Sequence, residues 1–404
     1  MLSRGTFVGV TIAVMFLSST ASVSAQFCGF SCNAPQTFAE QLGGANVILL
    51  AERISSSKQA KQTTFLIRHV GIGESEELRV GGLVTAPYFL KNKKPRLWLL
   101  FATQDDNGQL QWSAPLEASE SLLKYVLEAP APDIVASERL PYFLRFLESD
   151  EPLIADDAFL ELNSAEWEDI LACTSQLPRD KLREWLRNPQ TKPTRIGLYA
   201  ELLGVCGNKT DAEELLEHIR QPTNDFRFGM DGYNIAYLWR TGEKGLAVLD
   251  ELKLRPNDSH FSERYAVMQA IRFMVAHGSE RISRERACES MRLLLEAPEF
   301  ADLAIADLGR WEDWSAQDCL MSLYGQGEYD NRPTKRAIVR YLLKAAKVQP
   351  PNADEQKQDD PTARNSQPED LASTAQQAQA SLEALRAKDP KTVQEAERFF
   401  LLLQ

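Results

Sequence analysis

The chain has 404 residues, of which 44% are hydrophobic and 25% are charged, a composition typical of folded globular proteins. Its formal net charge of −12 argues against nucleic acid or an anionic membrane as the main partner, because both need a basic protein surface. A chain of this length is expected to form two or three units, each with its own core.

Residues 1–25 have the pattern of a secretory signal peptide. Arg4 is followed by the apolar run FVGVTIAVMFL and then by small residues that end at Ala25. The apolar run is shorter than the about 20 residues that a helix needs to cross a bilayer, so cleavage after Ala25 is favoured over a retained anchor. The mature chain would begin at Gln26 and has no later apolar segment long enough to span a membrane. It is therefore predicted to be exported, periplasmic or extracellular, and soluble.

Two cysteines, Cys28 and Cys32, stand directly behind this signal in AQFCGFSCNAP. Phe27 occupies the position before Cys28, where a lipoprotein would need a small residue, so lipidation is not expected. In an oxidising compartment a local disulfide is the favoured interpretation, and it needs a turn that brings the two Cα atoms within about 7 Å. A metal site and a redox pair are the alternatives. Two thiolates alone leave a metal short of ligands, and a redox pair is normally C-x-x-C.

Residues 26–113 are predicted to form a small β-barrel. Four short runs rich in Val, Leu, Phe and Thr are separated by clusters of Gly, Ser, Lys and Asn, which is the pattern of strands and turns. The runs are NVILLAER (46–53), TTFLIRHV (63–70), GLVTAPYF (82–89) and RLWLLFAT (96–103). Their spacing suits a small barrel.

The turn before the last of these runs is basic. It contains Lys91, Lys93, Lys94 and Arg96, and loops of this kind on small barrels often contact polyanions. These four residues are candidates for binding, with an ordinary solvated hairpin as the alternative.

With Cys28-x-x-x-Cys32 in front and AEQLGGANVILLAER following, residues 28–113 resemble the netrin or tissue-inhibitor module, a variant of the oligonucleotide/oligosaccharide-binding (OB) barrel. The resemblance implies a barrel with a cysteine-bearing N-terminal segment. That family usually joins its N-terminal cysteines to partners further along the same domain, whereas the next cysteine here is Cys173. Its inhibitors insert the amine of an N-terminal cysteine into a metalloprotease. Because Cys28 would follow Gln26 and Phe27, protease inhibition is not implied.

Residues 114–136 are interpreted as a connecting helix and linker, and from residue 137 the apolar period changes from two to about 3.6. Within residues 194–219 one helix is predicted to end at Gly207, and the next to begin with a capping box from Thr210 to Glu213. Similar amphipathic segments occur at 153–163, 166–173, 266–277, 287–298 and 336–347. Helix pairs of this kind predict an α-solenoid over 137–347, although no clean repeat period is measurable.

These segments resemble HEAT repeats, which often carry polar residues near helix starts. Asp156, Asp157, Arg195 and Asp211 stand at such positions. As a whole, the chain resembles a family of exported bacterial proteins that join a small barrel to HEAT-like helices. The resemblance implies an architecture and no activity.

Trp239, Trp311 and Trp314 stand near helix ends, where aromatic side chains can line a groove for a partner; core packing is the alternative. The remaining cysteines each fall on an apolar helical stripe and are predicted to be small buried side chains. They are Cys173, Cys206, Cys288 and Cys319.

A search for catalytic motifs finds none. The histidines His69, His218, His260 and His277 are isolated, and H-E-x-x-H, G-x-S-x-G and P-loop patterns are absent. Adjacent carboxylates such as Asp105 with Asp106 and Asp156 with Asp157 diverge in direction and are predicted to be solvated. No catalytic residue, metal site or cofactor is predicted.

Residues 348–370 are rich in Pro, Gln and Asp and predict a disordered linker. Residues 371–404 predict two short amphipathic helices, the second ending in an apolar run from Phe399 to Leu403. This tethered tail suggests docking, either back on the solenoid or onto another protein.

The predicted fold class is multidomain α+β: an OB/netrin-like barrel, an α-solenoid of HEAT-like helix pairs, and a disordered linker with terminal helices. The favoured function is a non-enzymatic protein-interaction scaffold of the bacterial cell envelope. The alternative is an envelope enzyme or metal/redox protein that uses Cys28 and Cys32.

The interpretation of Cys28 and Cys32 is tested by thiol mapping of native, unreduced protein. We expect the N-terminal peptide to begin at Gln26 and to be two mass units lighter than its reduced form, because a disulfide has formed. Neither cysteine should then react with an alkylating reagent before reduction. Free alkylation of both cysteines, or a metal bound at one per chain, would refute the disulfide.

Overall fold

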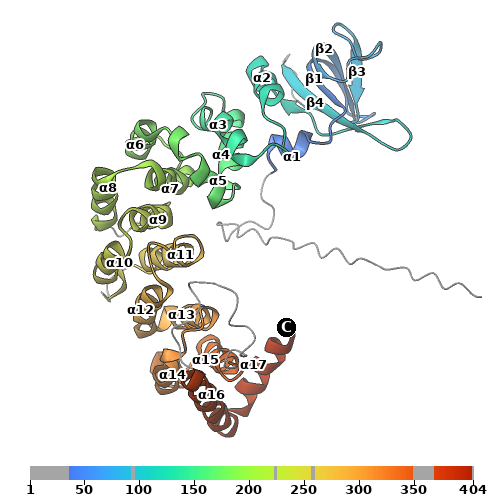
Figure 1. Ribbon diagram of the computed structural model, residues 1–404. Coiled ribbons are helices and arrows are strands. Elements are labelled where there is room, and N and C mark those ends of the chain that lie inside the picture. Colours follow the sequence, from blue (N-terminus) through green and yellow to red (C-terminus); the bar gives the residue numbers. More distant parts are fainter. Residues whose placement is uncertain (1–35, 92–95, 223–224, 256–259, 349–367, 403–404) are drawn as a thin grey trace, which may run out of the picture. The chain divides into compact units, whose positions relative to one another are not determined.

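The computed structural model describes residues 36–91, 96–222, 225–255, 260–348 and 368–402. It is an α+β protein in which an antiparallel sheet precedes many helices (Figure 1). The chain divides into two compact units: the first reaches Val126 and includes Ser164–Glu166, and the second contains Leu127–Asn163 and the chain from Trp167 onward. No described helix has the length and apolar character needed to cross a membrane.

Within its described residues, the first unit contains two helices and six strands. The helices are α1 (Phe38–Leu42) and α2 (Glu120–Glu128), and the strands are β1 (Val47–Ser57), β2 (Gln62–Ile72), β3 (Leu83–Ala86), β4 (Leu97–Gln104), β5 (Leu110–Trp112) and β6 (Leu116–Glu117). The strands pair in the order β3-β2-β1-β4-β5, with β6 beside β4, and every pair is antiparallel. The four predicted strands are thus present, and β5 and β6 are additional.

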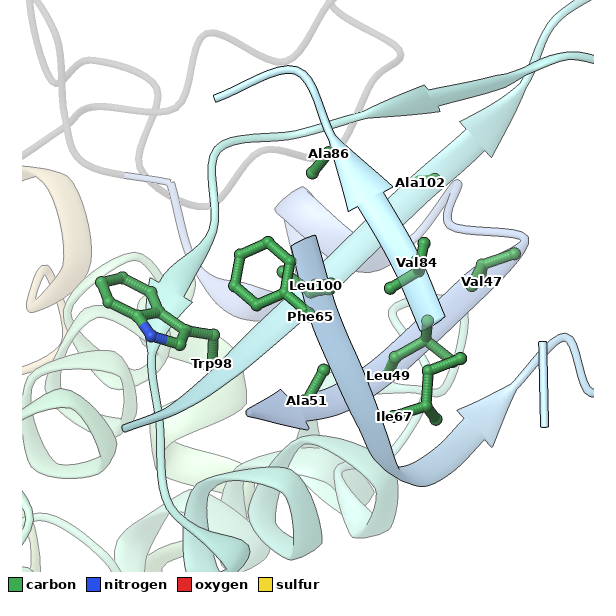
Figure 2. Close-up of a cluster of buried hydrophobic side chains, with 10 residues drawn as sticks. All are labelled: Val47, Leu49, Ala51, Phe65, Ile67, Val84, Ala86, Trp98, Leu100 and Ala102. Atoms are coloured by element: carbon green, nitrogen blue, oxygen red, sulfur yellow. The ribbon is translucent and has the colours of Figure 1, made fainter. Parts of the chain in front are cut away.

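The two central strands are buried on both faces, which explains their unbroken apolar sequences. One face carries the cluster in Figure 2, made of side chains from β1 to β4; its members are Val47, Leu49, Ala51, Phe65, Ile67, Val84, Ala86, Trp98, Leu100 and Ala102. The opposite face, with Ile48 and Leu99, is covered by Leu42 of α1 and by Leu123 of α2. A strand covered on both faces needs apolar residues at every position rather than alternate ones.

The sheet curls around the cluster of Figure 2. Irregular register between β1 and β2, for example between Leu50 and Ala51, bends the strands. The Tyr88 hydroxyl, beyond the end of β3, donates a hydrogen bond of 3.1 Å to the carbonyl of Trp112 at the end of β5. The two outer ends of the strand path are therefore joined through a side chain.

The first unit is longer than the predicted barrel of 26–113. The segment 114–136, expected to be a connecting helix and linker, contains the helix α2 and also the strand β6, and their apolar side chains Leu123 and Leu116 pack on the sheet. The sequence pattern of a short amphipathic helix does not reveal which surface it covers.

The second unit is helical. Its α-helices are α3 (Ala136–Leu144), α4 (Pro152–Asn163), α5 (Trp167–Ala172), α6 (Arg179–Arg187), α7 (Ile196–Cys206), α8 (Lys209–Arg220), α9 (Met230–Thr241), α10 (Glu243–Leu249), α11 (Phe261–His277), α12 (Arg284–Leu293), α13 (Pro298–Arg310), α14 (Gln317–Leu323), α15 (Arg332–Ala345), α16 (Pro368–Lys388) and α17 (Pro390–Leu402). Shorter helical segments are η1 (Thr174–Gln176), η2 (Pro193–Arg195), η3 (Asp250–Leu254), η4 (Leu294–Glu296), η5 (Trp314–Ala316) and η6 (Gly327–Tyr329).

Alternate helices pack on one another along the chain: α7 on α9, α9 on α11, α13 on α15, and α15 on α17 (Figure 1). Between α11 and α13 the rings of Phe261 and Phe300 stack with their centroids 4.5 Å apart. Each helix pair therefore buries its apolar face against the next pair.

The turn between α7 and α8 corrects one detail of the sequence analysis. The helix α7 ends at Cys206 and Gly207 follows, as predicted. The capping box of α8, however, joins Asn208 and Asp211 rather than Thr210 and Glu213: Asn208 accepts from the Asp211 amide, and the Asp211 carboxylate accepts from the Asn208 amide at 2.7 Å. The capping asparagine thus stands two residues before the predicted Thr210, directly after Gly207.

Buried carboxylates in this unit are neutralised by arginines from a neighbouring helix pair. Asp211 and Asp307 are fully buried, and Asp250 and Glu263 are nearly so. The partners are 32 to 36 residues apart in sequence; the pairs are Arg179 with Asp211, Arg227 with Glu263, Arg272 with Asp307, and Arg286 with Asp250. A buried charge is tolerated only when it is paired, so these contacts fix which pairs lie side by side.

The two C-terminal helices pack on α15. The helix α16 begins at Pro368, three residues before the end of the predicted linker, and residues 349–367 of that linker lie outside the described ranges. On α17, Val393 and Ala396 are buried, and Thr392 donates from its amide to the Asp389 carboxylate. The helix α17 thus contacts the helical unit, whereas the side chains of the predicted apolar run from Phe399 to Leu403 lie outside those that the structure describes.

A seam of small residues brings α7 and α9 into close contact. A Cβ atom at Gly204 would lie 2.6 Å from the Cα of Ala236, so only glycine fits there. By helical spacing Glu201 lies on the same face of α7. Burial and the nearby negative charge of Asp231 raise the pKa of Glu201 to about 8.

Glu201 should make the stability of the protein depend on pH. Its pKa of about 8 in the folded chain exceeds the ordinary value of 4.5, so the folded chain retains a proton that the unfolded chain releases between these values. Stability is therefore expected to fall as pH rises from 4.5 to 8. The variant Glu201→Gln should be more stable at pH 8 by about 1 to 2 kcal/mol and equally stable near pH 4. Urea denaturation across this range measures the difference, and a constant difference at all pH values would contradict the assignment.

Candidate functional site

The predicted N-terminal site residues are only partly described. Cys28, Cys32, Lys93 and Lys94 lie outside the described ranges. Lys91 and Arg96 are exposed, and the Arg96 guanidinium forms an ion pair with Glu117 of β6. Arg96 therefore already has an anionic partner within the first unit.

The three predicted tryptophans occupy different environments. Trp239 is 5% exposed: its ring packs edge-on against Trp167 with centroids 5.0 Å apart, and the Arg281 guanidinium lies 4.4 Å from its ring centroid. Trp311 is 8% exposed. These two tryptophans are core residues and offer little surface to a partner, so the alternative interpretation, core packing, applies to them. Trp314 is half-buried and lines a groove.

Other predicted environments need correction. Cys173 and Cys288 are buried, but Cys319 is exposed, because the short helix α14 that carries it leaves that side uncovered. Asp157 is 5% exposed and therefore not solvated, and Asp156 accepts hydrogen bonds of 2.6 Å from Arg195 and from Lys192. Adjacent residues on a helix point about 100° apart, so one of them can face the core.

The groove that contains Trp314 lies between α13 and α15 and has a volume of about 1050 Å³. Apolar and aromatic side chains contribute to its lining, notably Ile305, Trp314 and Tyr341. The basic residues that line it are Arg310, Arg332, Arg336, Arg340, Lys344 and Lys347, and the acidic ones are Asp302 and Glu312. In a protein of net charge −12, this is a local concentration of positive charge.

The sequence of α15 accounts for both properties of the groove. Asn331 caps the helix by accepting from the Thr334 amide at 2.9 Å. Cationic residues then recur every three or four positions from Arg332 to Lys347 without a single Asp or Glu, which places them along one side of the helix. Residues such as Ile338 and Leu342 face the core. We call the cationic row the α15 basic stripe: Arg332, Arg336, Arg340, Lys344 and Lys347.

Tyr341 and Trp314 form the aromatic part of the floor. Their ring centroids are 5.2 Å apart in an edge-to-face arrangement. The Tyr341 hydroxyl donates to the carbonyl of Asp313, and burial raises its pKa well above the usual range. Gly309 of α13 lies against the same ring, where a Cβ would meet Tyr341 at 3.3 Å. The Tyr341 ring is therefore held in position by this hydrogen bond and by its packing against Trp314 and Gly309.

The charges around the groove are compensated unevenly. At one end Arg332 and Arg336 bind the Glu395 carboxylate of α17, with N–O distances of 2.9 and 2.6 Å. Arg310 pairs with Asp307 at 2.9 Å. Lys344 is exposed and makes no ion pair with a described residue; partial burial, and then the positive charge of Arg310, lower its pKa. The positively charged side chains of Lys344 and Arg310 therefore lie near each other in the groove.

Glu312 on the groove wall has an unusual backbone conformation. Its φ is 60°, in the left-handed region, and the Asp313 amide donates to the Leu308 carbonyl at 2.9 Å to close the end of α13. Glycine is the usual residue at such a position.

No family model matches the chain, and the search of the curated proteins finds no similar one. Among the residues that the structure describes, no group of three or more His, Cys, Asp or Glu side chains is placed to hold a metal ion.

The sequence analysis named Trp314 but missed the basic stripe. The signal was present, because RPTKRAIVRYLLKAAK contains six cationic and no acidic residues, which an average surface helix does not. What the sequence did not contain was the position of α13 opposite this stripe.

The conformation of Glu312 predicts a measurable strain. Replacing it by glycine should raise the free energy of unfolding by up to about 1 kcal/mol, because glycine adopts positive φ without a steric penalty. The control Glu312→Ala removes the same carboxylate but keeps the Cβ, so it should show no gain. Urea denaturation compares the two, and equal stability of both variants would rule out strain as the cause.

Proposed function

We propose that this chain is a non-enzymatic interaction protein of the bacterial cell envelope, and that the groove between α13 and α15 holds part of a protein partner. The observation that carries the proposal is the groove itself, which combines an aromatic floor with basic side chains in about 1050 Å³. Protein interfaces are enriched in aromatic residues and arginine for the same reasons: large contact area and multiple hydrogen-bond donors.

The architecture that we propose around this groove is a HEAT-like α-solenoid. The ion pairs between residues 32 to 36 apart support it, because a constant separation of about one helix pair is what stacked repeats produce. The strand order and the bond from Tyr88 to Trp112 support an OB-like barrel for the first unit. A stack of helix pairs presents a long binding surface, which suits a scaffold.

Export remains part of this proposal and rests on the signal pattern of residues 1–25. The competing function, an envelope enzyme or metal/redox protein that uses Cys28 and Cys32, depends on residues outside the described ranges, and no observation favours it.

The proposal is tested by cross-linking and co-purification from native envelopes. We expect the full-length protein to recover a specific partner, and the variant Lys344→Glu/Lys347→Glu to recover less than about a tenth as much, because reversing rim charges repels the partner. Both lysines are exposed, so the variant should fold normally.

The matched control is Lys209→Glu/Lys244→Glu, which makes the same change of net charge on exposed positions of α8 and α10. It should recover the partner at the unmodified level. Equal recovery by both variants, or no specific partner with the unmodified protein, would refute a role for the groove.

A further inference from the structure

We propose that the occupant of the α13–α15 groove is an acidic, amphipathic helical segment of a protein partner. This inference rests on the proposed function and adds the chemistry and shape of the bound segment. Four features support it: the positive charge of the stripe, the apolar lining of the groove, the acidic residues on the opposite wall, and the packing of α17 on α15.

The α15 basic stripe extends over the length of the helix. From Arg332 to Lys347 it spans about 22 Å at 1.5 Å per residue. A single phosphate or carboxylate can engage only one or two of these side chains. Because Arg332 and Arg336 already bind Glu395, the part of the stripe that faces a ligand runs from Arg340 to Lys347, about 10 Å. A ligand that matches this part carries two or three negative charges about one helical turn apart, as a helix with Glu at every third or fourth position does.

The floor requires apolar groups on the same ligand. Leu303, Ala306 and Trp314 line the groove and keep exposed surface, which a purely ionic polymer would leave without apolar contacts. A helix with acidic residues on one side and leucine-like residues on another satisfies both surfaces at once, as in helix-in-groove recognition.

The opposite wall sets the direction of the acidic face. Asp302 and Glu312 line the groove from α13 and the turn that follows it, whereas the stripe lines it from α15. Carboxylates of the bound segment are attracted to α15 and repelled by these two acids. The segment therefore turns its acidic face toward Lys344 and away from Glu312.

The protein itself contains the same kind of contact. On α17, Glu395 binds Arg332 and Arg336 of the stripe while Val393 and Ala396 are buried. An amphipathic helix with a carboxylate placed on α15 arginines is thus already docked at one side of this helix. Lys344, which pairs with no carboxylate of the residues that the structure describes, is available for an equivalent contact.

The test uses the full-length protein and a synthetic helical peptide with Leu on one face and Glu on the other, followed by fluorescence anisotropy. The acidic peptide should bind, and Lys344→Glu/Lys347→Glu should weaken its binding about tenfold or more, whereas Lys209→Glu/Lys244→Glu should change it less than twofold. Trp314→Ala should also weaken it, because the floor loses an aromatic contact.

A charge-exchanged peptide, with Lys in place of Glu, shows that a weakened variant is still folded. It should bind Lys344→Glu/Lys347→Glu more tightly than the unmodified protein. If the Lys and Glu peptides bind the unmodified protein equally, the proposed acidic recognition is wrong.

Two further probes distinguish an acidic helical segment from other anionic ligands of the groove. Linear polyphosphate that binds as tightly as the acidic peptide, with no effect of Trp314→Ala, would identify a phosphate-polymer site and overturn the inference. Groove-dependent binding to phosphatidylglycerol vesicles in place of the peptide would overturn it in favour of a lipid surface. Capture of an envelope partner through Lys344 and Lys347 without any binding of the acidic peptide would leave the proposed function intact and reject only this inference.

Discussion

The helical unit depends on buried carboxylates that receive their counter-charge from another helix pair. Asp307 of α13 illustrates the constraint: it is fully buried, and burial raises its pKa, while Arg272 of α11 donates to it at 2.7 Å. Removing Arg272 would leave this buried carboxylate with only the largely exposed Arg310 as a partner, and an incompletely paired buried charge is destabilising. Apolar packing between helices tolerates small shifts, whereas such an ion pair does not. These pairs therefore specify the register in which each helix pair meets the next.

The same constraint explains how the groove acquires its charge. Along most of the unit, arginines and carboxylates from neighbouring pairs are matched. The charged residues of α15 are all cationic, and α17 supplies Glu395 to two of them, Arg332 and Arg336. Lys344 is left beside Arg310 without an acidic partner among the described residues, so positive charge accumulates where the stack of helices approaches its C-terminal end. The positive charge of the groove thus arises from a local excess of cationic side chains in a unit that elsewhere pairs them with carboxylates.

The first unit is stabilised differently. Its central strands are covered on one face by the cluster around Phe65 and Trp98, and on the other by α1 and α2. Burial on two faces requires the continuous apolar sequences of β1 and β4, and it makes α2 part of the sheet unit rather than a linker. The sheet unit is thus held by apolar contact, whereas the helical unit adds charge pairing that selects specific neighbours.

The sequence by itself determined the main secondary structure of both units, although not β5, β6 or the capping residues of α8. The apolar runs of β1 to β4, the helical period from residue 137, the end of α7 before Gly207 and the two terminal helices follow from local spacing and turn chemistry. The sequence also contained the basic stripe of α15. Only the tertiary structure decided that Trp239 is a core residue while Trp314 lines a groove, because both stand near helix ends and differ in what packs over them. Likewise, the groove exists because α13 lies opposite α15, and that placement depends on contacts between residues some 35 positions apart, such as Arg272 and Asp307, which no local pattern encodes.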